Sequence, residues 1–299
     1  KILGISGDIP LNPNVILSFN DVPVDKFNQY SLSFVLNKLI EPMFEKIKPI
    51  QHKLKIHFYS SETERITQTS LQQTFEWFKI RNVSDENIHY LSEIPGFQTV
   101  YSLLEDEPLS SHLVIMISLN NNSTSNKTEG SVGLLFNAPL DDVENEVYLF
   151  RPLEIGKSQI SQRMEEYLEV EQTEGDENIH LWMTNVDVQS THVLTEVIGN
   201  SNCNYTIAGI HSMNVCFGDV SSIYAWNSVV CAAETIKTKG ENSLAILQNN
   251  GDIESIQLAK TPAKMPDDNF YHMSGVHMYY LIGLTLFSLG IILFINTIS

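Results

Sequence analysis

The cysteine and serine residues of the chain are the first candidates for covalent chemistry. The sequence contains three cysteines and no Cys-x-x-Cys pair; the three are Cys203, Cys216 and Cys231. An odd number of cysteines without paired spacing is typical of reduced thiols. A serine hydrolase needs Gly-x-Ser-x-Gly at a strand-to-helix turn, and the nearest approach is Ser6 in Gly-Ile-Ser-Gly. Neither residue type therefore predicts a standard nucleophilic site.

Three histidines of the C-terminal half, with two nearby carboxylates, invite comparison with a metal centre. They are His180, His192 and His211, with Asp187 and Glu196. Their spacing matches no established pattern of metal ligands, and placement on strands and helices would scatter them. We therefore expect these histidines to be surface or hydrogen-bonded residues, and we expect no metal and no cofactor.

The charge balance limits the partners of the chain. Lys and Arg number 18 against 36 Asp and Glu, which gives a formal net charge of -18. Such a surface repels phosphate backbones, so nucleic-acid binding is excluded as a function. The acidic run at 165–177 is typical of a solvated face, although it also fits docking of a basic partner.

Apolar runs of strand length alternate with helical stretches through the first half. An uninterrupted apolar run such as 112–119 predicts a buried strand, and the runs at 131–137 and 146–150 can form a hairpin. The predicted strands are 1–5, 14–19, 54–60, 88–91, 112–119, 131–137 and 146–150, and the predicted helices are 30–48, 62–80 and 97–105.

The second half repeats this order of elements. Asp219 and Gly240 are suitable caps for a helix over 220–239, and residues 249–252 are typical of a tight turn between the last two strands. Two α/β halves with one order of elements predict a pseudo-twofold duplication around mixed sheets. The predicted strands are 179–185, 205–210, 242–248 and 253–259, and the predicted helices lie near 158–177, at 190–198 and at 220–239.

The end of the sequence is different in character. Tyr279–Ile295 contains no charged residue and is just long enough to cross a bilayer. A buried core helix is the alternative, but such a helix normally shows a polar face. We predict a transmembrane helix at 277–297 after a linker at 261–276. Because Lys260 and Lys264 precede this run and no basic residue follows it, the body is expected on the cytoplasmic side.

Three segments resemble parts of the β-ketoacyl synthases. Ile207–Leu258 resembles the C-terminal part of such an enzyme, and Ile179–Glu196 is similar to the strand and turn that carry the first catalytic histidine. Phe97–Leu119 resembles the helix and strand after the nucleophile. The resemblance implies the thiolase fold, a layered α-β-α-β-α core with an N-terminal half at 1–156 and a C-terminal half at 157–260.

The catalytic residues of that family are missing at the matching positions. The condensation reaction needs a cysteine nucleophile and two histidines. The resemblance places the nucleophile near Gly96, in the run Ile-Pro-Gly-Phe at 94–97, and the two histidines at Asn185 and Asp219. The resemblance therefore implies the fold without the activity.

Three functions remain open. The first is a catalytically inactive, membrane-anchored scaffold or interaction subunit that forms a homodimer or a heterodimer with a related synthase-like subunit. The second is an acyl-transfer or acyl-condensing enzyme that uses Cys216, Asp219 or His211 in rearranged roles. The third is an unrelated α/β adaptor of a membrane assembly. The resemblance implies that the apolar run at 112–119 forms an edge strand, through which such proteins pair. The alternative is that this strand is central in its sheet.

Overall fold

The computed structural model of the chain describes residues 27–80, 85–107, 109–119, 129–136, 147–170, 178–201, 205–218 and 221–261. The chain divides into two compact units, Lys1–Ala263 and Lys264–Ser299, and all of these residues belong to the first. The strands predicted at 1–5 and 14–19 and the membrane helix predicted at 277–297 lie outside the described residues. No helix within the described ranges is long and apolar enough to cross a membrane.

The first sheet has four strands in the order β2-β1-β3-β4. β1 pairs in parallel with both β2 and β3, and β4 is antiparallel to β3. The strands are β1 (Leu54–Ser60), β2 (Ile88–Tyr90), β3 (Ser111–Ser118) and β4 (Gly130–Phe136). The helical elements of this half are α1 (Phe27–Ile40), η2 (Glu41–Met43), α2 (Phe44–Ile47), η3 (Gln51–Lys53), α3 (Glu64–Phe78), η4 (Asp85–Asn87) and α4 (Phe97–Asp106).

The second sheet repeats this arrangement in the order β8-β7-β9-β10, with β5 and β6 paired along β10. β7 is parallel to β8 and β9, and β10 is antiparallel to β9. The strands are β5 (Tyr148–Leu149), β6 (Leu153–Ile155), β7 (Asn178–Thr184), β8 (Thr206–Ser212), β9 (Asn242–Asn249) and β10 (Asp252–Ala259). The helical elements are η5 (Lys157–Gln159), α5 (Ile160–Val170), α6 (Val188–Asn200), α7 (Met213–Phe217) and α8 (Ile223–Lys239).

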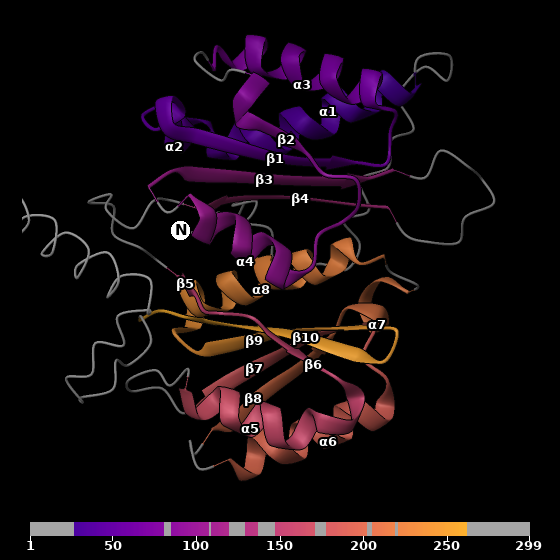
Figure 1. Cartoon of the computed structure of the whole chain (residues 1–299), viewed down its shortest axis with the longest axis vertical. Coiled ribbons are helices and arrows are strands. Elements are labelled where there is room, and N and C mark those ends of the chain that lie inside the picture. Colours follow the sequence, from indigo (N-terminus) through magenta and orange to yellow (C-terminus); the bar gives the residue numbers. More distant parts are fainter. Residues whose placement is uncertain are drawn as a thin grey trace, which may run out of the picture. The chain divides into compact units, whose positions relative to one another are not determined.

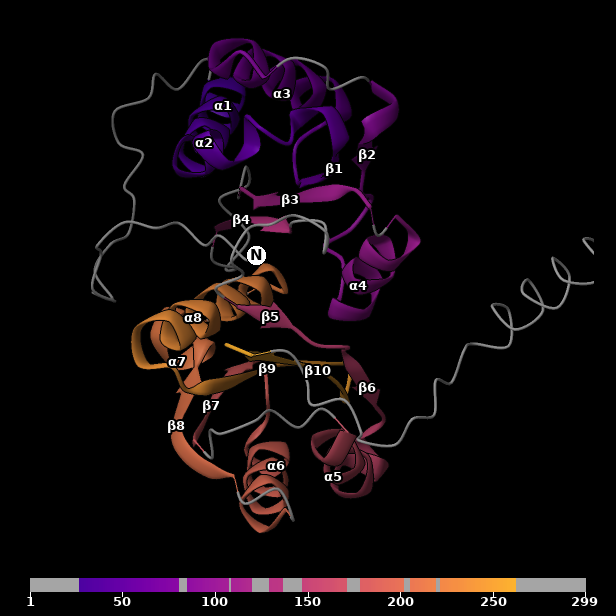
Figure 2. The ribbon, with the colours of Figure 1, turned by 90° about the vertical axis from the view of Figure 1, so that its left-hand side faces the viewer.

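The two sheets and their helices form five layers (Figures 1 and 2). α1 and α3 cover one face of the first sheet, α4 and α8 lie between the sheets, and α5 and α6 cover the far face of the second sheet. Two hydrophobic clusters fill the outer spaces between the covering helices and the sheets, and a third fills the region between the two sheets, around the central helices. Each half has the same order of strands and the same mixed pairing, so the predicted duplication around mixed sheets is confirmed.

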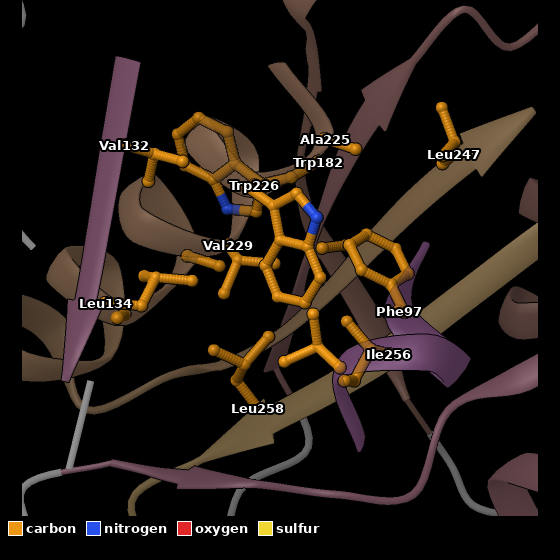
Figure 3. Close-up of a cluster of buried hydrophobic side chains, with 14 of the residues drawn as sticks. Phe97, Val132, Leu134, Trp182, Ala225, Trp226, Val229, Leu247, Ile256 and Leu258 are labelled. Atoms are coloured by element: carbon orange, nitrogen blue, oxygen red, sulfur yellow. The ribbon is translucent and has the colours of Figure 1, made fainter. Parts of the chain in front are cut away.

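The central cluster joins the two halves (Figure 3). Trp226 of α8 contacts the ring of Phe97 of α4 edge to face, with ring centroids 5.0 Å apart. Val132 and Leu134 of β4 and Leu258 of β10 belong to the same cluster. Because residues of both sheets are buried together there, the central layer is a core shared by the two halves.

Two predicted strand pairings are wrong. β4 pairs with β3, and β5 pairs with β10 of the other sheet, so the hairpin of 131–137 with 146–150 does not form. β3 lies between β1 and β4 and is not at an edge. The physical reason is that β3 buries both faces, with Ile115 in the outer cluster and Val114 in the central cluster. An apolar strand of this kind belongs in a sheet interior.

Two predicted helices begin or end elsewhere. The helix predicted at 30–48 is divided into α1 and α2 by η2, which contains Pro42 near its start. Proline at the first position of a helical turn is compatible with a new start but not with continuation of the preceding helix. The long helix predicted at 220–239 begins at Ile223 and ends at Lys239, with the predicted cap Gly240 in the left-handed conformation. Its predicted cap, Asp219, lies outside the described residues.

Candidate functional site

The turn that leads into α4 is the position at which the resemblance places a nucleophile. Gly96 is the N-cap of this helix, with φ -71° and ψ 174°, and Phe97 is the first helical residue. The first backbone N–H groups of a helix have no partner within the helix and carry partial positive charge. Such a position can bind an anion or lower the pKa of a nucleophile. Whether this turn can bind an anion or activate a nucleophile therefore depends on which group contacts these N–H groups.

A carboxylate of the chain itself occupies this helix end. Oε2 of Glu254, on β10, accepts a hydrogen bond from the backbone N–H of Phe97 at 2.7 Å. A Cβ atom at Gly96 would lie 2.5 and 2.6 Å from the two carboxylate oxygens. The absence of a side chain at Gly96 therefore allows Glu254 to reach α4 from the other half of the molecule.

The surroundings of Glu254 raise the pKa of its carboxyl group above the ordinary value. Burial raises the pKa of this carboxyl group, and the negative charge of Glu154 raises it further, although the N–H groups of Phe97 and Gln98 act in the opposite direction. Glu154 lies directly opposite Glu254 in the antiparallel pairing of β6 with β10. Two carboxylates in this position repel each other across the strands.

A second contact from the C-terminal half closes the same turn. Nε1 of Trp226, on α8, donates a hydrogen bond to the carbonyl oxygen of Pro95 at 2.8 Å. Trp226 is 1% exposed, and Pro95 and Phe97 are also buried. None of the residues at 94–97 carries a nucleophilic side chain. The turn is held by hydrogen bonds and apolar contacts from the other half.

The position expected for the first histidine holds an asparagine pair. Asn185 follows β7 with a positive φ of 56°. Its backbone N–H donates to Oδ1 of Asn214 on α7 at 2.7 Å, and Nδ2 of Asn214 donates to Oδ1 of Asn185 at 2.7 Å. Carboxamide side chains donate and accept hydrogen bonds but do not ionise at neutral pH, so this pair cannot replace a histidine as an acid or a base. The position expected for the second histidine, Asp219, lies outside the described residues.

The thiols and the histidine considered for a rearranged catalytic site lie in different environments. Cys216 on α7 is exposed, whereas Cys231 lies on α8 and burial raises the pKa of its thiol to about 11. Neighbouring charge from Cys216 and Glu234 adds to that rise. His211 is hydrogen-bonded to His180. Cys203 and Ser6 lie outside the described residues.

The five residues considered as metal ligands do not form one cluster. His192 and Glu196 are exposed on α6, with Nδ1 and Oε2 3.9 Å apart. Asp187 caps α6 by accepting from the backbone N–H of Ser190 at 2.6 Å. This N–H group, followed by the Lys157 ammonium, holds the pKa of the Asp187 carboxyl well below its usual range. Within the described ranges no group of three or more His, Cys, Asp or Glu residues is arranged to hold a metal ion.

Two buried histidine networks are the part of the site that sequence analysis missed. In the first half Nε2 of His57 lies 3.0 Å from Nδ1 of His112. In the second half Nδ1 of His180 lies 3.1 Å from Nε2 of His211, and Nε2 of His180 lies 2.6 Å from Oε2 of Glu241. A repeated Ile-His dipeptide was the available signal for three of these four histidines, whereas His112 follows a serine. The dipeptide occurs in or directly at the end of predicted strands, at 56–57, 88–89, 179–180 and 210–211.

Comparisons with known proteins find similar folds but no similar sequence. No family model matches the chain. No curated protein matches it either.

Several solved structures are similar to this chain over most of its length. The peroxisomal 3-ketoacyl-CoA thiolase of Saccharomyces cerevisiae matches with a TM-score of 0.54 and 9% identity, covering 79% of this chain and 92% of the thiolase. That thiolase is described as a five-layered α-β-α-β-α structure built from two core domains of identical topology.

Two polyketide synthase structures give similar values. A type II polyketide synthase complex, of an acyl-carrier protein with its ketosynthase, matches with a TM-score of 0.53 and 8% identity, covering 81% of this chain and 88% of the other. Germicidin synthase of Streptomyces coelicolor, a type III polyketide synthase, matches with a TM-score of 0.52 and 7% identity, covering 78% and 73%. At these identities the likeness concerns the fold alone: the chain has the mixed α/β fold of the thiolases and ketosynthases.

Proposed function

We propose that this protein is a catalytically inactive, β-ketoacyl-synthase-like subunit that serves as an interaction or scaffold component of a larger complex. The observation that carries the proposal is the closed N-terminus of α4. Glu254 bonds the N–H of Phe97, and Trp226 bonds the carbonyl of Pro95. Both contacts use groups at the position where the resemblance places the family's nucleophile.

The chemistry of acyl transfer is incompatible with this arrangement. Attack on a thioester needs a nucleophile and N–H donors that are free to stabilise the developing oxyanion. Here the N–H of Phe97 already donates to a carboxylate at 2.7 Å. An oxyanion at that position would meet the oxygens of Glu254, which repel it when they are ionised. The turn therefore lacks the nucleophile and also the anion site.

Incubation of the full chain with radiolabelled acyl thioesters tests the inactive state. We expect no protein-bound acyl group and no labelling by a thiol-directed ketosynthase inhibitor, whereas an active condensing enzyme treated in parallel is labelled. The Cys216→Ala variant is the matched control, because Cys216 is the exposed thiol of the described residues. Acyl transfer that disappears in this variant would favour the second hypothesis, an enzyme with a rearranged site.

Assembly is part of the same proposal. A scaffold subunit needs a partner, which is either a second copy or a related synthase-like chain. Among the described strands of the first sheet, β2 and β4 form the edges. An exposed strand edge can extend its sheet with a strand of a partner. Light scattering on the purified chain should give twice the chain mass for a homodimer, and a mass of one chain would require the heterodimer.

Membrane attachment through residues 277–297 completes the proposal. Its support is the uncharged run Tyr279–Ile295, which matches the thickness of a bilayer. The acidic body, with most of the net charge of -18, is unsuited to lie on an anionic lipid surface by itself. We therefore assign attachment to the apolar run. The basic residues Lys260 and Lys264, which precede this run, support a body on the cytoplasmic side.

A further inference from the structure

Each half of the molecule buries a hydrogen-bonded histidine pair on the face of its sheet that looks toward the central helices. His57 and His112 are each 3% exposed and His180 is 2% exposed. Strand alternation places His112 on the same face as Val114 and places His180 on the same face as Trp182, and both of these neighbours belong to the central cluster. His57 on β1 and His180 on β7 lie on equivalent strands, but their partners lie on opposite neighbours, on β3 in the first half and on β8 in the second. The two networks also end on different chemical groups.

The hydrogen-bond partners of the first network determine where its protons lie. Nε2 of His112 is 3.1 Å from the backbone carbonyl of Glu107, which can only accept, so Nε2 of His112 carries a proton. In the neutral ring Nδ1 of His112 is then an acceptor, and it receives the proton of His57 Nε2 at 3.0 Å. Nδ1 of His57 is left unprotonated, buried and without a hydrogen-bond partner in the described structure.

No place remains in the first network for an additional proton. On Nδ1 of His57 it would have no acceptor, and on Nδ1 of His112 it would oppose the N–H of His57. The other charges near the pair are those of Lys55, His89 and Glu107. The ring of His89 stacks on His57 with centroids 5.2 Å apart, and the Glu107 carboxylate is already paired with Lys55 at 3.1 Å. Burial, followed by His112 and His89, lowers the pKa of His57 to about 4.

The second network ends on a carboxylate instead of a backbone carbonyl. Nε2 of His180 donates to the Glu241 carboxylate at 2.6 Å. Nδ1 of His180 lies 3.1 Å from Nε2 of His211, so the two rings share one hydrogen bond. Burial, followed by His180 and by the remaining nearby charge, Lys239, lowers the pKa of His211. Glu241 thus supplies the counter-charge that the Glu107 carbonyl does not.

We propose that the first network is an acid-sensitive latch that keeps the C-terminal end of α4 against β1 and β3, and that mild acidification opens the first half before the second. α4 ends at Asp106, and the next residue, Glu107, makes both the carbonyl contact to His112 and the ion pair to Lys55. The N-terminal end of α4 remains held by Glu254 and Trp226.

The direction of the pH effect follows from proton linkage. A histidine whose pKa is lowered in the folded state binds its proton more readily when the region opens. Stability of the latch is therefore full above the ordinary histidine pKa of 6.5 and falls as the pH decreases toward about 4. At pH 5 this difference corresponds to an increase in the opening equilibrium of at least about tenfold.

Hydrogen exchange of the full chain in mild detergent, measured by mass spectrometry at pH 7.5, 6 and 5, tests the proposal. After correction for intrinsic exchange rates, we expect peptides from β1, β3 and α4 to lose at least about tenfold in protection at pH 5, relative to peptides from β7 and β9. Equal loss in both sheets, or no loss in the first, would overturn it.

Two glutamine variants identify the histidine that is responsible. His57→Gln keeps an N–H donor near the Nε2 position and removes the site of protonation, so the acid response of the first half should be reduced. His180→Gln is the matched control, and it should leave that response unchanged. An undiminished response in His57→Gln contradicts the latch. If His57→Gln does not fold at pH 7.5, the proposal is judged from the unmodified protein, by comparing the loss of hydrogen-exchange protection in its two sheets.

Discussion

Gly96 and Glu254 show how one absent side chain can close a site. The backbone angles of Gly96 lie in an ordinary extended region, so glycine is not needed there for its conformational freedom. It is needed because a Cβ atom would lie 2.5 Å from a carboxylate oxygen of Glu254. Glycine at this position therefore permits a contact between the two halves of the molecule.

Gly96→Ala should destabilise the protein by displacing the Glu254 carboxylate. Because that side chain is flexible, the main cost is the lost hydrogen bond to Phe97, and we expect the free energy of unfolding to fall by about 1–3 kcal/mol. Glu254→Ala should cost a similar amount. In the double variant the two costs should not add, since both remove one interaction. Urea unfolding of the four proteins measures this, and strictly additive costs would contradict the contact.

Glu254→Gln should have a pH-dependent effect of the opposite sign. A carboxyl group with a raised pKa in the folded state stabilises the protein at low pH, and this contribution is lost as the pH rises through the folded pKa. Glutamine resembles the protonated form and still accepts from Phe97. The variant should therefore be more stable than the parent at pH 7.5 and equally stable near pH 3. Thermal melts at the two pH values provide the measurement; a lower melting temperature at pH 7.5 would show that the ionised form is preferred.

At this scale the sequence identified one partner of each contact. The resemblance pointed to Gly96, but Glu254 and Trp226 lie far along the chain, and no local pattern connects them to the turn. The histidines can be located in the sequence, but no sequence pattern indicates which of them form hydrogen-bonded pairs. His57 and His112 belong to different strands, and only the register of β1 with β3 brings their rings together.

Among the elements, strand positions followed closely from hydrophobic pattern. β1 occupies the predicted 54–60, and β3 is shifted by one residue from the predicted 112–119. Their positions follow from the burial of both faces, which the apolar residues within each strand indicate. Pairing is different, because it depends on which strand offers a free edge elsewhere in the fold. The predicted hairpin failed for this reason: β10 of the second sheet takes β5 as its neighbour.

Ile115→Lys should unfold the first half without selectively breaking an assembly. Ile115 is fully buried in the outer cluster and lies on an interior strand. A charge at this position has no partner and should cost more than about 4 kcal/mol. The matched control is Ile210→Lys on the edge strand β8, where the side chain is 50% exposed and the change should be nearly neutral. Circular dichroism melts separate the two, and a folded Ile115→Lys monomer would contradict the interior placement.

For the whole molecule, duplication of the α/β halves was predictable because the order of elements repeats along the sequence. The shared central layer was not, because helices α4 and α8 look like ordinary amphipathic helices when each is considered alone. Their common burial between two sheets emerges only when the halves are assembled (Figure 2). The closed turn and the two histidine networks all depend on this layer.

Truncation after Lys264 should separate the body from the membrane. The first compact unit, Lys1–Ala263, is complete in this shortened chain, so we expect a folded protein in the soluble fraction. The full chain should remain in the pellet after carbonate extraction. Fractionation, with circular dichroism on the soluble material, measures both outcomes. Carbonate-resistant attachment of the shortened chain would show that another part of the protein binds the membrane.

The shared central layer also has a consequence for biosynthesis. The inner face of the first sheet is complete once β4 has been made, but the residues that cover it, Trp226 on α8 and Leu258 on β10, are translated much later. At about 5–20 residues per second, ribosomes need several seconds to reach them. During this interval the nascent chain exposes an apolar sheet surface together with the uncapped start of α4. We therefore expect the emerging chain to depend on a ribosome-associated chaperone until its final strands have been made.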